Sequence, residues 1–144
     1  MPKRILFVDD EDWSVTPYFD KLRDHGLEVD LALNGDEAIE RLRSHRYDLI
    51  VLDIMLPSGS QIGSNVEPRK AGAILLDKIR TNQLTDIKTS PDVPVVVLTA
   101  VTDQEESENI RKLGVNEVFE KPALFEEVTD KILALVNGEK GRKK

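Results

Sequence analysis

Hydrophobic patterning along the chain predicts five short β-strands separated by amphipathic helices. The predicted strands are rich in β-branched residues, and the second alternates apolar with polar positions. The others are mostly continuous apolar runs, which are typical of parallel strands covered by helices on both faces of a sheet. The expected strands are residues 5–8, 27–33, 49–52, 95–98 and the shorter 118–119.

Helical periodicity occupies the intervals between these strands. Pro17 is incompatible with a normal interior turn, so the first helix is expected to start after Thr16 with Pro17 in its first helical position. After the second strand, Asn34 and Glu37 have the spacing of a helix-capping pair. Three later helices are expected over residues 72–80, from Thr102 or Asp103 to a stop at Gly114, and over residues 125–137.

Five alternations of strand and helix predict an α/β fold, a doubly wound parallel sheet of the flavodoxin-like (βα)5 type with strand order 2-1-3-4-5. Residues 1–137 are expected to form one domain. Residues 57–70 have no periodicity and many Gly, Ser and Pro breakers, so we expect an extended loop after the third strand. A lid or a partner-docking role for this loop is an alternative to a plain insertion. Residues 138–144 are expected to form a basic, solvated tail.

Composition narrows the function classes. The chain of 144 residues has no cysteine, which excludes disulfides and thiolate metal sites and suits a reducing compartment. No apolar run resembles a signal peptide or a membrane span. The net charge of −7 has the wrong sign for a general nucleic-acid binder. We therefore expect a cytoplasmic protein that neither inserts into membranes nor binds nucleic acid directly.

Acidic residues follow two of the predicted strands. Asp9 and Asp10 follow the first strand and Asp53 follows the third, and these strands are neighbours in the expected order. The three carboxylates should therefore converge at one sheet edge, where their repulsion favours a hard divalent cation, best Mg²⁺. The alternative is that residues 9–12 are only an acidic helix start stabilised by the helix dipole. That alternative leaves Asp53 unexplained.

The fourth and fifth strands end in a hydroxyl and a cation. Thr99 closes the fourth strand and Lys121 follows the fifth. Alone, Thr99 would be an ordinary strand-end residue and Lys121 a surface charge. At the same edge as the acids, they are the groups that a phosphorylated carboxylate needs as partners. Whether the Lys121–Pro122 peptide is cis or trans stays open.

Four sequence blocks resemble the signature blocks of bacterial two-component response-regulator receiver domains, in the same order and across nearly the whole chain. Each block is weakly specific, whereas four in order are highly specific. The blocks are ILFVDDE (5–11), DLIVLDIMLP (48–57), VVLTA (96–100) and GVNEVFEKP (114–122).

This resemblance implies a single-domain receiver that accepts a phosphoryl group on Asp53 from a sensor histidine kinase or a phosphotransfer protein. It further implies that Asp10, Asp53 and the backbone carbonyl of Met55 bind Mg²⁺, with Asp9 acting partly through water. Thr99 and Lys121 would contact the phosphoryl group. Phosphorylation would switch binding to a downstream protein, and a phosphorylation-dependent dimer is a further hypothesis. Such a protein catalyses only its own phosphorylation and dephosphorylation.

The fifth strand departs from the family pattern. Receivers usually carry an aromatic switch residue three positions before the lysine, and here that position is Val118, with Phe119 beside it. Alternate positions of a strand point to opposite faces, so Phe119 should point away from the usual side. We expect signalling without an aromatic swing at this position. A bulge that brings Phe119 into place is the alternative.

Two other functions remain open from the sequence. Phosphatases of the haloacid-dehalogenase type also use Mg²⁺ and a strand-end aspartate, but they need a second Asp two residues later as acid and base. Met55 occupies that position. The other alternative is a receiver-like module that binds partners without phosphorylation, and the full set of acids, Thr99 and Lys121 disfavours it.

Overall fold

A computed structural model describes residues 3–54, 68–84, 86–100, 104–121 and 123–137. Strands and helices alternate along the chain, as the hydrophobic pattern predicts. The strands are β1 (Arg4–Val8), β2 (Glu28–Ala32), β3 (Leu49–Leu52), β4 (Val95–Thr99) and β5 (Glu117–Glu120). The helices are α1 (Asp12–Asp24), α2 (Gly35–Ser44), α3 (Pro68–Arg80), α4 (Gln104–Lys112) and α5 (Phe125–Val136).

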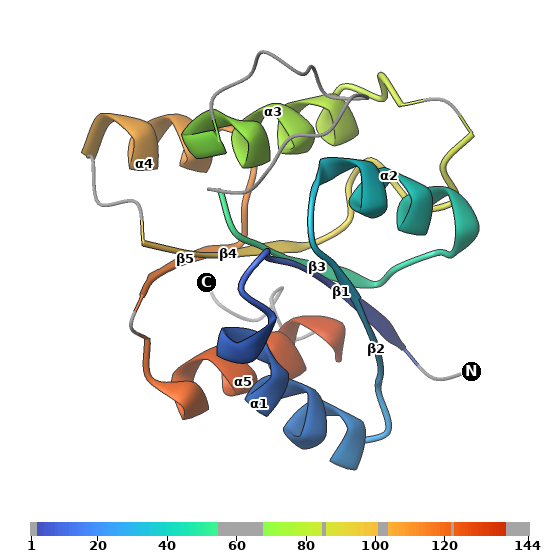
Figure 1. The fold of residues 1–144 in the computed structure, drawn as a ribbon, viewed down its shortest axis with the longest axis vertical. Helices are drawn as coiled ribbons and strands as arrows, with labels where there is room; N and C mark the ends of the chain where they lie inside the picture. Colours follow the sequence, from blue (N-terminus) through green and yellow to red (C-terminus); the bar gives the residue numbers. More distant parts are fainter. Residues whose placement is uncertain (1–2, 55–67, 85, 101–103, 122, 138–144) are drawn as a thin grey trace.

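The strands form one parallel sheet in the order β2-β1-β3-β4-β5, which confirms the predicted flavodoxin-like topology. Helices α1 and α5 cover one face of the sheet, and α2, α3 and α4 cover the other (Figure 1). Every residue of β3 and β4 is buried, as expected for strands with helices on both sides. Each face has its own apolar core, one with α1 and α5 and one with α2 and α3. No helix in the described part of the chain is long and apolar enough to span a membrane.

The predicted start of the first helix was wrong. Helix α1 begins at Asp12 and carries Pro17 in its interior. Pro17 cannot donate to the carbonyl four residues back, but only one backbone bond is lost. The earlier start places Val15, Phe19 and Leu22 on the buried face against the sheet. Burial of these side chains outweighs the missing bond, because most helical stability in proteins comes from tertiary packing.

Helix α3 also begins earlier than predicted, at Pro68 instead of Gly72. The predicted loop 57–70 is therefore too long, because residues 68–70 are helical. Proline suits the first helical position, where its missing N–H has no intrahelical partner to lose. Residues 57–67 of the predicted loop, the predicted start at Thr102 or Asp103, Pro122 and the tail 138–144 all lie outside the described residues.

The predicted cap of α2 is confirmed. The Asn34 side chain accepts a hydrogen bond from the Glu37 N–H at 2.9 Å, and the Glu37 carboxylate accepts one from the Leu33 N–H at 2.8 Å. These bonds satisfy backbone donors at the helix start and define where β2 ends. At the other end of the chain, Gly114 has a φ of +84° after α4, the left-handed conformation expected of a helix stop.

Candidate functional site

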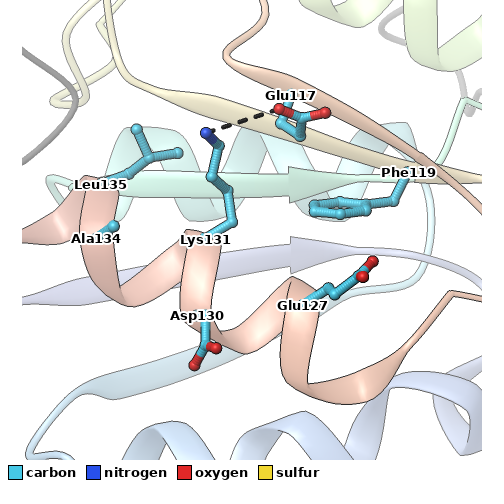
Figure 2. Close-up of a pocket in the computed structure, with 7 residues that line it drawn as sticks. All are labelled: Glu117, Phe119, Glu127, Asp130, Lys131, Ala134 and Leu135. Atoms are coloured by element: carbon cyan, nitrogen blue, oxygen red, sulfur yellow. Dashed lines mark ion pairs between the residues drawn. The ribbon is translucent and has the colours of Figure 1, made fainter. Parts of the chain in front are cut away.

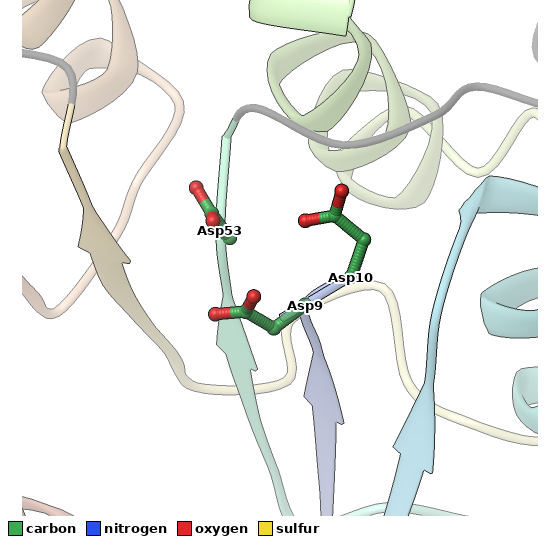
Figure 3. A group of neighbouring side chains, drawn as sticks. All are labelled: Asp9, Asp10 and Asp53. Atoms are coloured by element: carbon green, nitrogen blue, oxygen red, sulfur yellow. The ribbon is translucent and has the colours of Figure 1, made fainter. Parts of the chain in front are cut away.

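Three carboxylates meet where β1 and β3 end. Asp9 and Asp10 directly follow β1, and Asp53 directly follows β3 (Figure 3). One oxygen from each carboxylate lies within 4.8 Å of the others. The backbone fixes this arrangement, because the Asp53 N–H donates to the Val8 carbonyl at 2.9 Å. The predicted convergence of the acids follows from the parallel pairing of adjacent strands.

The three acids differ in their surroundings. Asp9 and Asp53 are buried, with 2% and 6% of their surface exposed, whereas Asp10 is exposed. The Asp9 Oδ1 atom accepts a hydrogen bond from the Glu11 N–H at 2.9 Å. This local turn precedes α1, so Asp9 does not act as a helix-start residue. The helix-dipole alternative therefore does not explain the position of Asp9 or that of Asp53.

The side chain of Lys121, which follows β5, contacts the two buried carboxylates, Asp9 and Asp53. Its Nζ atom donates to Asp9 Oδ2 at 2.9 Å and to Asp53 Oδ2 at 3.3 Å. Glu11 Oε1 lies 3.7 Å from the same ammonium, although this side chain is half exposed. The Lys121 N–H donates to the Thr99 carbonyl at 2.8 Å, so β4 positions the base of the lysine. Lys121 follows β5, and its side chain crosses the ends of the intervening strands to reach Asp9.

The electrostatics of this cluster favour an added cation. Burial raises the pKa of the Asp9 carboxyl, and the nearby Asp53 charge raises it further, against the opposing effect of Lys121 and the Glu11 N–H. Burial alone would lower the pKa of the Lys121 ammonium, but its bonds and charge interactions with Asp9 and Asp53 raise it overall. One ammonium among three carboxylates leaves the site with excess negative charge.

The donor set suits a hard divalent cation. Asp9, Asp10 and Asp53 supply only carboxylate oxygens, the ligands that Mg²⁺ and Ca²⁺ prefer over the nitrogen and sulfur ligands of Zn²⁺. The exposed Asp10 leaves one side of the cluster open to solvent, which fits a cation that keeps several waters. The residues present therefore fit Mg²⁺. The Met55 carbonyl, a further predicted ligand, lies outside the described residues.

Thr99 lies at the end of β4, at the same sheet edge as the acids. It is 1% exposed, and its backbone carbonyl holds Lys121. Thus all four strand ends named from the sequence, those of β1, β3, β4 and β5, contribute to one site. Trp13, near the start of α1, is exposed, with 72% of its surface accessible.

Gly72 belongs to the site although the sequence pattern did not single it out. It lies in α3, and its N–H donates to the Ile54 carbonyl at 2.9 Å. A Cβ atom at this position would lie 2.5 Å from Ile54 Cα and 2.7 Å from the Asp53 carbonyl oxygen. Helix α3 therefore packs directly on the backbone that carries Asp53. The sequence pattern placed this glycine at the start of the expected helix 72–80, which does not say what the helix approaches.

The β5 strand is regular and contains no bulge at the switch position. Val118 pairs with Val97 and Phe119 with Leu98. Val118 packs on the core beneath α2 and α3, whereas Phe119 packs on the core beneath α1 and α5. Figure 2 shows Phe119 beside α5, where it lines a cavity of about 410 Å³ with Ala134 and Leu135. The bulge alternative was therefore wrong, and Phe119 faces away from Val118.

Comparisons with known proteins agree on one family. A family model described as the response regulator receiver domain matches residues 5–133. Among curated proteins, the polar-differentiation response regulator DivK of Brucella anthropi is 31% identical over 122 residues, which cover 85% of this chain and 86% of that protein. The transcriptional regulatory protein DltR of Streptococcus agalactiae is 32% identical over 92% of this chain but 50% of its own length. The chain thus spans about half the length of the first relatives it matches.

Solved structures share the fold. A response regulator receiver domain protein described as CheY-like, from Methanospirillum hungatei, aligns over 100% of both chains with a TM-score of 0.75 and 24% identity. The receiver domain of the sensor histidine kinase PA1611 from Pseudomonas aeruginosa aligns over 96% of this chain and all of its own, with a TM-score of 0.71 and 25% identity. That structure has a magnesium ion coordinated in its active-site cleft.

Proposed function

The chain belongs to the response regulator receiver family, and on that premise we propose that Asp53 accepts a phosphoryl group from a phosphohistidine of a sensor histidine kinase or phosphotransfer protein. The observation that carries this proposal is the Lys121 ammonium, which bonds both Asp9 and Asp53 where four strands end. Asp9 has both oxygens engaged, by Glu11 and by Lys121, and Asp10 is exposed. The resemblance of residues 48–57 to a receiver signature block makes Asp53 the candidate for the nucleophile.

In the proposed reaction an Asp53 oxygen attacks phosphorus while the phosphorus–nitrogen bond to the donor histidine breaks. The product is an acyl phosphate, and the imidazole leaves. Positioning and charge neutralisation supply most of the catalysis of phosphoryl transfer. Lys121 is already within 3.3 Å of Asp53, so its ammonium can follow the charge onto the phosphoryl oxygens without a large movement.

Asp9, Asp10, Asp53 and the Met55 carbonyl would hold Mg²⁺, with Asp9 acting partly through water. When bound, the cation would neutralise charge on the phosphoryl oxygens. Thr99 would donate its hydroxyl to the same group, because it is buried at the end of the strand next to Asp53. These roles are supported by the shared sheet edge and the buried carboxylates.

Receivers act as signalling modules and not as classical enzymes, so the proposed product is a change in partner binding. The packing of two β5 residues bears on how phosphorylation at Asp53 could alter the surface that binds a partner. Val118 occupies the position three residues before Lys121 and packs towards α2 and α3. Phe119 packs towards α5. We expect a relay without an aromatic swing at position 118, to a downstream protein or to a second copy of the chain.

Phosphoryl incorporation tests the proposed function. Purified protein incubated with Mg²⁺ and acetyl phosphate should gain one phosphoryl group, detected by intact mass and removed by hydroxylamine as expected for an acyl phosphate. Chelation of Mg²⁺ should prevent the gain. Continuous hydrolysis of a phosphomonoester without a phosphoprotein would instead support the haloacid-dehalogenase alternative. Absence of both reactions would support the unphosphorylated binding module.

Magnesium binding gives a second expected result. Trp13 is largely exposed three residues after Asp10, so we expect its fluorescence to change saturably as Mg²⁺ is added. Bound cation should also raise the melting temperature, because it binds only the folded protein. Asp10→Asn should weaken Mg²⁺ binding by roughly tenfold or more, since it removes a charged ligand. Asp20→Asn is the matched control, an exposed α1 carboxylate outside the cluster. Equal affinities in the two variants would contradict the assignment of Asp10.

A further inference from the structure

A second concave surface lies at the opposite edge of the sheet from Asp53. It forms where β1, β2 and β3 begin and where α2 ends, and its volume is about 640 Å³. The Lys88 N–H donates to the Leu42 carbonyl in α2 at 2.8 Å, which ties the segment that carries Lys88 to this helix. The cavity is within the size range of small-ligand sites. None of the roles proposed for Asp53 and Lys121 uses this surface.

The charges that line this cavity are unbalanced. Four cations, Lys3, Arg4, Arg46 and Lys88, face two carboxylates, those of Glu28 and Asp48, so the sum is +2. The carboxylates already have partners. Glu28 pairs with the Arg4 guanidinium, and Asp48 Oδ2 accepts the Arg4 N–H at 2.9 Å. A positive concavity on a chain of net charge −7 focuses attraction on anions.

The other three cations have no such pairing. Within the described part of the chain, Lys3, Arg46 and Lys88 make no ion pair with a carboxylate. The dipole at the end of α2 would explain cations in its last turn, where Arg41 and Arg43 lie. It does not explain Lys3, which precedes β1, or Lys88, which precedes β4. Three chain segments therefore bring unpaired cations to one cavity.

His45 also lines this cavity, and one nitrogen of its ring is buried. His45 caps α2 at its C-terminal end, and its ring packs edge-on against Tyr47 with 6.0 Å between centroids. The His45 Nδ1 atom is buried without a hydrogen-bond partner among the described residues. Such an atom costs free energy unless something bonds it, because it has lost its water. A rotation of the ring that turns this nitrogen towards the cavity would let a bound anion accept a hydrogen bond from it.

We propose that this cavity binds a small anion of the pyrophosphate class, either as the inorganic ion or as part of a nucleotide. Arg46, Lys88 and Lys3 contact its phosphate oxygens, and His45 supplies a further bond. A ligand with several charged oxygens matches three cations from separate chain segments better than a single carboxylate does. The proposed phosphoacceptor lies at the other edge of the sheet, so this site is independent of Asp53 chemistry.

Calorimetric titration with pyrophosphate, ADP and citrate tests the proposal. The titrations contain EDTA, so that no metal at the acidic cluster binds the phosphates. We expect saturable binding of pyrophosphate, with ADP at equal or higher affinity. If ADP and pyrophosphate bind with equal affinity, the cavity recognises only the phosphates. If ADP binds more tightly, the cavity also contacts the nucleoside. Citrate binding as tightly as pyrophosphate would overturn the phosphate class, and no binding of either phosphate would overturn the site.

Two charge-reversal variants separate the cavity from general attraction. Arg46→Glu combined with Lys88→Glu should weaken pyrophosphate binding by roughly tenfold or more, because both changes place repulsion inside the cavity. Lys21→Glu combined with Arg111→Glu makes the same change in net charge outside it and should leave the affinity within about twofold. Equal losses in the two double variants would overturn the proposal. His45→Phe keeps the ring against Tyr47 and should weaken binding by roughly threefold. Melting curves confirm that each variant is folded.

Discussion

Asp53→Asn should abolish phosphoryl incorporation while leaving the fold intact. The amide that replaces the carboxylate has the same shape but almost no nucleophilicity. We expect the rate of incorporation from acetyl phosphate to fall by roughly a thousandfold or more, equivalent to about 4 kcal/mol of activation free energy. Lys121 keeps its shorter bond, the 2.9 Å contact with Asp9, so the ends of the strands should stay in place. Intact mass after incubation measures the incorporation.

Two comparisons make this result specific. Asp20→Asn removes an exposed carboxylate from α1 and should incorporate phosphate at the wild-type rate. The melting temperatures of the two variants should be similar, since relief of repulsion around Asp53 offsets its lost ion pair. Peptide mapping of the wild-type protein should place the phosphate on Asp53. Phosphate on Asp9 or Asp10, or incorporation by the Asp53→Asn variant, would show that the nucleophile is another residue.

Gly72→Ala should destabilise the protein and slow phosphorylation together. Alanine normally stabilises a helix relative to glycine, by up to about 1 kcal/mol. Here its Cβ would lie 2.5 Å from Ile54 Cα and 2.7 Å from the Asp53 carbonyl oxygen, so backbone must move. Overpacking of this kind costs about 1–3 kcal/mol, and we expect a net loss near 2 kcal/mol in the free energy of unfolding. The displaced Asp53 should lose roughly tenfold or more in phosphorylation rate.

Gly26→Ala provides the contrast for this variant. Gly26 has a φ of +84°, but no atom lies within 4 Å of an added Cβ. In Gly26→Ala, backbone strain alone should lower the free energy of unfolding by about 1–2 kcal/mol. The phosphorylation rate should not change. Urea unfolding measures the first quantity and the mass assay the second. A Gly72→Ala variant with wild-type rate and stability would show that α3 can shift without moving Asp53.

Strand positions and strand order were predictable because they depend on local patterns. Short continuous apolar runs rich in β-branched residues are typical of buried strands in a sheet covered on both faces, and helical periodicity between them makes parallel crossovers the simplest connection. The convergence of Asp9, Asp10 and Asp53 then follows, since each acid directly follows a strand and the strands are neighbours. The capping pair of Asn34 and Glu37 was predictable for the same reason, as its spacing is only three residues.

Helix starts were less predictable because packing competes with local preference. Pro17 favours a first helical position, yet α1 begins at Asp12, where Val15 and Leu22 reach the core. The start of α3 was placed at Gly72, and the structure places it at Pro68. For α1 packing on the sheet decides the boundary, whereas the start of α3 at Pro68 follows the local preference of proline for the first helical position. A proline inside a helix costs about 3 kcal/mol, whereas burial of each large apolar side chain of α1 contributes about 1.5–3 kcal/mol, so several such side chains outweigh it.

The sequence by itself determined the fold class, the strand order, the family and the strand-end residues from which the site is built, because each rests on short-range patterns. The tertiary structure alone decided how those residues meet. Lys121 lies 112 positions from Asp9 along the chain, and no local pattern states that its ammonium bonds both Asp9 and Asp53. The contact of Gly72 with the Asp53 backbone and the gathering of Lys3, Arg46 and Lys88 around one cavity are of the same kind. Such contacts join distant segments, and their geometry exists only after the helices pack on the sheet.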